Sequence, residues 1–132
     1  MVRFGWRWCY NRFTNDILRY FSQIDFDRCN PPCNIEQMRP YFLEILDDAR
    51  HIAKIPFVPT SAYRSVEHEI QKGRKGTSSH TKGIAIDLKA NTGREKFLIV
   101  SSLIKCGVTR IGIYKTFIHA DIDEEKPDKV IW

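Results

Sequence analysis

Two runs of β-branched and aromatic residues near the end of the chain, 108–114 and 117–122, are separated by only a tight turn. This spacing is typical of neighbouring antiparallel strands. Earlier strand-like runs, at 57–63 and 83–88, are separated from each other and from the later pair by helical or polar segments. Strands that are separated early and adjacent late indicate an α+β domain, with a mainly antiparallel sheet and helices packed on it.

The clearest helical pattern lies within residues 34–55, where apolar residues recur at steps of three and four. An asparagine at its start, with Gln37 three residues later, has the pattern of a capping box. Pro40 marks a point where the helix can bend or begin again. The charged residues, including Asp47 and Asp48, are expected on a solvated face, while the apolar stripe is expected to face the core.

Shorter elements complete the expected fold. Helices are predicted at 14–21, at 65–71 with Ser65 as its cap, and at 94–105, and the last of these is followed by a glycine that can end it. Residues 130–132 can add a final edge strand. The aromatic residues of segment 1–13 alternate with other residues, which favours a short strand or an extended arm.

Composition limits the class of protein. A chain of 132 residues with 42% apolar and 28% charged residues fits one globular domain. A spanning helix needs about twenty mostly apolar residues, and no such run exists, nor does an apolar stretch follow the basic N-terminus. We therefore expect neither a signal peptide nor a transmembrane segment, and no stable membrane insertion.

The formal charge of +5 favours an anionic partner such as nucleic acid, anionic lipid or cell-wall polymer. However, the basic residues are dispersed, and the densest cluster is only Lys72, Arg74 and Lys75. A solvated surface is the simpler interpretation, and a basic nucleic-acid-binding module is kept as an alternative.

Four cysteines are present, at positions 9, 29, 33 and 106. The Asn-Pro-Pro turn between Cys29 and Cys33 can hold these two close together, so a local disulfide or a structural metal pair is an alternative to free thiols. Cys9 and Cys106 have no partner at an informative spacing, which is typical of small buried apolar residues.

The candidate chemistry lies in the segments 61–65, 78–87 and 117–121. His80 directly precedes a predicted strand and Asp87 lies near the end of that strand, with small residues between them. His119 lies on another strand. Two histidines and one carboxylate make a three-ligand zinc site with a fourth position for water, whose pKa zinc lowers to about 7. The zinc-bound hydroxide of such a site can attack an amide carbonyl.

These segments resemble the zinc peptidases of the D-alanyl-D-alanine carboxypeptidase and L-alanyl-D-glutamate endopeptidase group, which share a fold with the hedgehog signalling domain. The pattern of this group is Ser-Gly-Tyr-Arg, then Ser-x-His-x-x-Gly-x-Ala-x-Asp, then His-x-Asp. It corresponds here to residues 61–64, 78–87 and 119–121. The resemblance implies a zinc peptidase domain over residues 20–132, preceded by an aromatic-rich extension at 1–19.

Carried over position by position, the resemblance implies that Zn²⁺ is held by His80, Asp87 and His119. Arg64 would lie beside the metal, polarise the scissile carbonyl and stabilise the oxyanion, a role that suits a permanently charged guanidinium. Ser78 would help to position substrate or a ligand histidine, although capping of its loop explains this serine nearly as well.

The sequence departs from the pattern of the group at the general base. Many members place Glu or Asp three residues before the last zinc histidine, where this chain has Thr116. Asp121 is the nearest carboxylate in sequence, and we predict it as the base, with orientation of the last zinc histidine as the alternative. Tyr114 is predicted to bind substrate, and Tyr114 and His68 are lesser candidates for an acid or stabilising role.

The resemblance implies zinc-dependent hydrolysis of an amide bond in peptidoglycan stem peptides, with the bond itself left open. We expect a monomer that stays in the host cytoplasm until it is released to the cell wall, as phage endolysins are, or that is carried by a virion. A bacterial recycling enzyme is a further alternative. The rival function is a catalytically inactive hedgehog-like zinc-binding domain that binds a partner or the cell wall, as Thr116 suggests.

Overall fold

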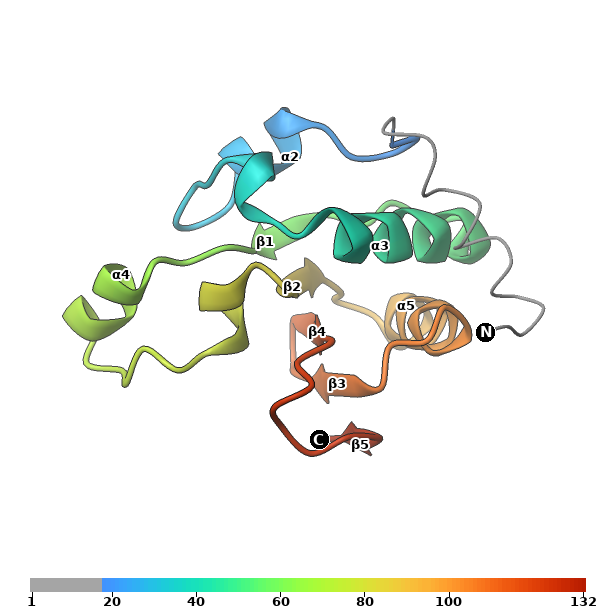
Figure 1. The fold of residues 1–132 in the computed structure, drawn as a ribbon. Helices are drawn as coiled ribbons and strands as arrows, with labels where there is room; N and C mark the ends of the chain where they lie inside the picture. The colour runs from blue at the N-terminus through green and yellow to red at the C-terminus, as the bar shows by residue number, and fades with distance from the viewer. Residues whose placement is uncertain (1–17) are drawn as a thin grey trace.

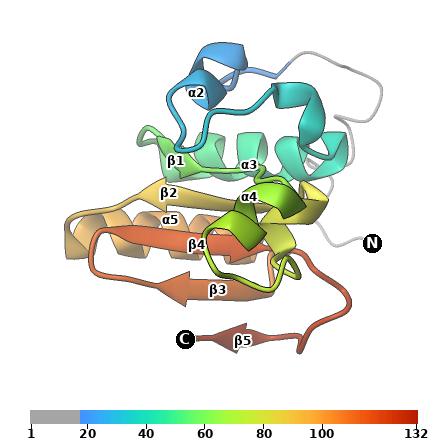
Figure 2. The ribbon, with the colours of Figure 1, turned by 90° about the vertical axis from the view of Figure 1, so that its left-hand side faces the viewer.

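The structure, a computed structural model, describes residues 18–132, within which five strands form one sheet in the order β1-β2-β4-β3-β5 (Figures 1 and 2). The strands are β1 Pro59–Ser61, β2 Ala85–Lys89, β3 Arg110–Ile113, β4 Phe117–Asp121 and β5 Val130–Ile131. Neighbouring strands are antiparallel, except that β5 runs parallel to β3. The predicted α+β class with a mainly antiparallel sheet is confirmed.

Helices cover the two faces of the sheet unequally. The helical elements are α2 Gln23–Asp27, η2 Ile35–Gln37, α3 Pro40–Ala53, α4 Val66–Gln71, η3 Ser79–Lys82 and α5 Gly93–Lys105. The two long helices, α3 and α5, lie together on one face, whereas the short elements α4 and η3 lie toward the other (Figures 1 and 2). Of the helices in the described part of the chain, none is long and apolar enough to cross a membrane.

The core lies between the sheet and the two long helices. Side chains alternate between the faces of a strand, and one face of the central strands is wholly apolar. Its members, each at most 1% exposed, are Ile86, Leu88, Ile111, Ile118 and Ala120. Burial of each large aliphatic side chain stabilises the fold by about 1.5–3 kcal/mol. The other face of the same strands is therefore free to carry polar side chains.

The predicted helix at 34–55 is divided into η2 and α3. Asn34 and Gln37 form the expected capping box at η2, and Pro40 occupies the first turn of α3. The break falls at Met38 and Arg39, whose backbones are extended, since a residue before proline disfavours the helical conformation. The Arg39 amide then donates to the carbonyl of Gly83 at 2.9 Å.

Asp47 and Asp48 are fully buried, so their predicted place on a solvated face is wrong. Arg19 covers them: its Nε lies 3.2 Å from Oδ2 of Asp47, and its guanidinium also pairs with Asp48. The backbone amide of Tyr20 donates to Asp47 at 2.8 Å. The two aspartates of α3 are thus buried under a segment that precedes the helix.

The helix predicted at 14–21 is wrong for residues 18–21, which are not helical, while residues 14–17 lie outside the described part of the chain. Backbone amides that a helix would use internally bind Asp47 instead. The helix of this region is α2, whose capping box joins Ser22 and Asp25. Most of the predicted extension at 1–19, with its aromatic residues and Cys9, also lies outside the described residues.

Cys29 and Cys33 are buried and free. Burial raises the pKa of the Cys29 thiol to about 12 and raises that of Cys33 as well. The thiol of Cys29 donates to the carbonyl of Asp25 at 3.6 Å. A protonated thiol is a poor nucleophile and a poor metal ligand, so both cysteines pack as small apolar residues.

Candidate metal centre

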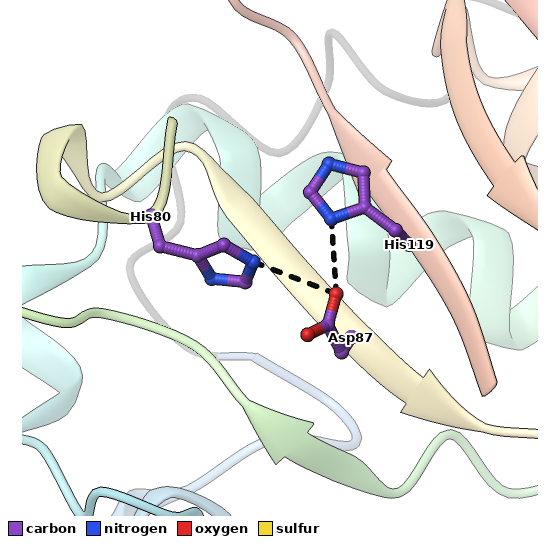
Figure 3. Close-up of side chains that lie close together, drawn as sticks. All are labelled: His80, Asp87 and His119. Atoms are coloured by element: carbon purple, nitrogen blue, oxygen red, sulfur yellow. Dashed lines mark hydrogen bonds and ion pairs between the residues drawn. The ribbon is translucent and has the colours of Figure 1, made fainter. Parts of the chain in front are cut away.

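Three side chains from different elements converge on the sheet face opposite the long helices (Figure 3). His80 comes from η3, Asp87 from β2 and His119 from β4. One ligand atom from each lies within 4.8 Å of the others, and this is the group of potential metal ligands that the described residues offer. The structure therefore brings together the three predicted ligands.

Strand pairing places two of these ligands. Asp87 and His119 are directly opposite each other in the β2–β4 pair, so their side chains emerge on the same face. Nδ1 of His119 lies 2.9 Å from Oδ1 of Asp87. Both side chains are about one-seventh exposed, at 14% and 13%, which leaves the site accessible to an ion and to a substrate.

A tight turn places the third ligand. The hydroxyl of Ser78 caps η3 by accepting a hydrogen bond from the His80 amide at 3.2 Å. Gly83 ends η3 with a positive φ of 73°, and a Cβ there would collide with the backbone carbonyl of Gln37. The serine and the glycine of this motif thus both have structural roles. Ser78 caps the turn, and Gly83 allows it to end close to Gln37.

The ring of His80 is held by its other nitrogen. Nδ1 donates to the carbonyl of Ala62 at 2.6 Å, which turns Nε2 toward Asp87, 3.5 Å from Oδ1. Ala62 is fully buried, and it contributes to the site through its backbone carbonyl, which holds the ring of His80.

His119 is held in the same way by Asp121. Nε2 of His119 donates to Oδ2 of Asp121 at 2.7 Å. The second oxygen of Asp121 accepts from Nε of Arg110 at 2.7 Å and from the amide of Asp123 at 3.0 Å. With its side chain only 1% exposed, Asp121 fixes the imidazole from behind.

The ionised carboxylate of Asp87 favours a cation at this site. Burial acts to raise the pKa of Asp87, but hydrogen bonds from His119 and His80 outweigh it and bring that pKa to about 2. Burial acts to lower the pKa of His119, but its hydrogen bonds to Asp121 and Asp87 raise it. An ionised carboxylate flanked by two imidazoles, each held through its far nitrogen, fits the ligand set of zinc.

Arg64 lies next to this group. Its backbone amide donates to the carbonyl of His80 at 3.2 Å, and its Nη1 donates to Oγ of Ser61 at 2.8 Å. Ser61 is the neighbour of Asp87 in the β1–β2 pair. Glu69 of α4, with a 1% exposed side chain, lies 3.1 Å from Nε of Arg64. The guanidinium is therefore held between Glu69 and Ser61, the strand neighbour of Asp87.

The contacts of Ser61 and Glu69 with Arg64 were not predicted from the sequence. The available signal was the Ser65 cap, which was predicted and which accepts from the His68 amide at 3.0 Å. Because this cap starts α4 directly after Arg64, the helix turns Glu69 back toward the arginine. His68 lies on the same helix, and Thr116 lies exposed in the turn between β3 and β4.

Tyr114 lies among aromatic residues beside His119. Its hydroxyl accepts a hydrogen bond from Nε1 of Trp132 at 2.7 Å, and its ring stacks on Phe117. The ring of Trp132 lies 5.6 Å from that of His119. The position of Trp132 depends on β5, which the sequence placed only as an edge strand of undetermined direction.

A buried carboxylate ties the turn of His80 to the end of β4. Oδ2 of Asp123 accepts from Oγ of Ser79 at 2.7 Å, and Lys82 contacts Oδ1 at 2.9 Å. Asp123 is 3% exposed. This cross-link holds η3, and so His80, against the strand that carries His119.

Two imidazoles and a carboxylate on the open face of a small α+β sheet match the three-ligand set of catalytic zinc centres. The sequence model of the Peptidase M15 family matches residues 19–121, and the chain belongs to this family of zinc peptidases. No curated protein matches the chain. The resemblance noted from the motifs is confirmed, and the protein is a peptidase.

Proposed function

We propose that this protein hydrolyses an amide bond in the stem peptides of bacterial peptidoglycan. The observation that carries the proposal is the convergence of His80, Asp87 and His119 in a chain of the M15 family. The substrate class is supported by the resemblance of the motifs to carboxypeptidases and endopeptidases of the cell wall. A net charge of +5 also suits an anionic wall, with an attraction that salt weakens.

His80 would hold the zinc ion through Nε2, His119 through Nδ1, and Asp87 through its carboxylate. When bound, zinc supplies Lewis acidity and activates water for attack on the amide. The residues around it keep these three donors in place: the Ala62 carbonyl orients one imidazole and Asp121 orients the other.

Arg64 would stabilise the negative charge that develops on the carbonyl oxygen of the substrate. Its guanidinium is fixed by Ser61 and Glu69 before substrate arrives, and its side chain is 17% exposed. A preorganised donor of this kind needs little reorganisation as the charge forms.

For Asp121 we propose the second of its two predicted roles. The carboxylate contacts the edge of His119 turned away from Asp87, and its second oxygen accepts from Arg110 and from the Asp123 amide. It is therefore a positioning residue for the metal ligand, which acts through His119 rather than on the substrate.

We further propose that the protein acts as a monomer. A phage would deliver it to the wall, either after release from the host cytoplasm or on the virion. Thr116 at the usual position of the base favours one other function, a zinc-binding domain without activity that binds a partner or the cell wall.

The test is digestion of purified peptidoglycan by the zinc-loaded protein, with and without a chelator, followed by mass spectrometry of the released fragments. We expect release that the chelator stops, that added zinc restores and that His80→Ala abolishes. His51→Ala, a histidine on α3 that binds Tyr20, is the matched control and should retain activity. Stoichiometric zinc without release from any wall type would favour the inactive binding domain.

A further inference from the structure

An aromatic side chain extends the row of metal ligands across the sheet. The pairing of β2, β4 and β3 places Asp87, His119 and Gly112 side by side on the same face. In the parallel β3–β5 pair, Ile111 is opposite Ile131, so the next residue, Trp132, follows beside Gly112. The indole therefore lies at the end of this row, with its ring centre 5.6 Å from that of His119.

Gly112 makes room for the indole. A Cβ at this position would lie 2.7 Å from Cε2 and Nε1 of Trp132 and 2.8 Å from Tyr114, closer than side-chain atoms approach one another. Only glycine allows both rings to lie over β3 as they do. This is a steric requirement, distinct from any need for an unusual backbone angle.

Three contacts fix the rings. Nε1 of Trp132 donates to the hydroxyl of Tyr114 at 2.7 Å, and Tyr114 stacks on Phe117 with ring centres 4.5 Å apart. The guanidinium of Arg110 lies 5.2 Å from the centre of the indole. Since Arg110 is also paired with Asp121, its charge is already compensated.

These fixed rings are nevertheless exposed, Trp132 by 46% and Tyr114 by 40%. Aromatic surface that is held in one orientation and left open to water beside a metal centre is typical of a surface that a ligand covers. We infer that Trp132 and Tyr114, here termed the aromatic wall, form the subsite for the substrate residue next to the scissile amide.

The chemistry of the wall selects the residue that it accepts. The wall is apolar, and the cation behind it is neutralised by Asp121, so it offers little to a charged side chain. In stem peptides, alanine carries an apolar methyl group, whereas glutamate and the diamino acid carry charges. The wall would therefore receive an alanyl residue. This assignment rests on the proposed function and deepens it by naming what lies beside the bond that is cut.

The first arm of the test measures hydrolysis of the peptide L-Ala-D-Glu-L-Lys-D-Ala-D-Ala at saturating zinc. We expect Trp132→Ala and Gly112→Ala to lower kcat/KM by at least about tenfold at an alanyl bond, the scale of losing an apolar contact. Tyr114→Phe, which removes only the hydrogen bond between the rings, and Trp132→Phe, which keeps a smaller aromatic ring, should have smaller effects and keep the fold. Ile131→Ala, the adjacent exposed residue of β5, is the matched control and should match the wild type.

The second arm does not depend on turnover. In a Trp6→Phe, Trp8→Phe background, Trp132 is the remaining tryptophan, and its emission reports on the wall directly. We expect a saturable change on titration with N-acetyl-L-Ala-D-Glu or with D-Ala-D-Ala, and none with D-Glu-L-Lys.

The outcomes separate the two proposals. Cleavage of stem peptides with wild-type kcat and KM in Trp132→Ala and Gly112→Ala would overturn the wall and leave the proposed function intact. Saturable binding of an alanyl dipeptide, without cleavage of any wall, would overturn the hydrolysis and support the wall. Activity losses that appear at limiting zinc and are absent at saturating zinc would show that Trp132 only supports His119, and would also overturn the subsite.

Discussion

The carboxylate of Asp121 accepts a hydrogen bond from Nε2 of His119 at 2.7 Å, on the opposite edge of the ring from the nitrogen that faces Asp87. This relationship predicts that Asp121→Asn weakens zinc binding by about 10–100-fold, because the ligand loses the group that fixes its orientation and raises its basicity. Competition with a chromogenic chelator measures the affinity. Unchanged affinity combined with lost turnover at saturating zinc would instead favour Asp121 as the general base.

Arg64 is expected to act on the reaction and not on the metal. Arg64→Ala should lower kcat by about 10²–10³-fold, the usual effect of removing an oxyanion donor, while zinc content stays at the wild-type level. Arg64→Lys should rescue little, because an ammonium cannot contact Ser61 and Glu69 together as the guanidinium does. Steady-state kinetics with metal analysis checks this, and equal kcat in both variants and the wild type would exclude the role.

Asp123 is expected to stabilise the fold at the turn that carries His80. Replacement by Asn should cost about 1.5–3 kcal/mol of unfolding free energy, since it removes the charge of a buried carboxylate that accepts hydrogen bonds from Ser79 and from the partly exposed Lys82. Urea denaturation measures the loss. Glu124→Gln, an exposed neighbour, is the control and should fall within about 0.5 kcal/mol of the wild type.

The same residue predicts a pH dependence. Burial acts to raise the pKa of Asp123, but hydrogen bonds from Ser79 and Lys82 outweigh it and hold that pKa at about 2, below the ordinary 3.8. A carboxyl whose pKa is lower in the folded state contributes stability that is complete above the ordinary value and is lost as the pH falls toward the folded value. Thermal denaturation between pH 5 and pH 2 should therefore show a shallower acid loss for Asp123→Asn than for the wild type, and parallel curves would contradict the assignment.

Arg19 is expected to anchor the start of the described chain to α3. Arg19→Ala should destabilise the protein by about 2–3 kcal/mol, because it withdraws a cation from the buried carboxylates of Asp47 and Asp48. Chemical denaturation compared with the exposed-site control Arg28→Ala measures the effect. Equal stability of the two variants would show that the pair contributes nothing measurable.

The sequence was sufficient where a feature depends on neighbouring residues. The capping box at Gln37, the cap at Ser65 and the turn between β3 and β4 are all local, and each was predicted. The convergence of the metal ligands was predictable for a different reason, since their motifs keep a fixed spacing.

Features that depend on distant chain segments were not predictable. Helical periodicity placed Asp47 correctly on the polar side of α3, but nothing local shows that Arg19, 28 residues earlier, covers that side. Likewise, the approach of Trp132 to His119 requires a parallel pairing of β5 with β3, and a two-residue strand carries too little pattern to set its direction.

The metal ligands Asp87 and His119 come together only when β2 and β4 pair in the observed register. These residues are 32 positions apart and face each other only in one alignment of β2 with β4. A slip of a single position would turn one of them toward α3 and α5 and exchange it for an aliphatic neighbour. The isolated β3–β4 hairpin carries only one of the three ligands, so it cannot form the zinc site. We therefore expect a refolding chain to bind zinc only after β2 has paired with β4.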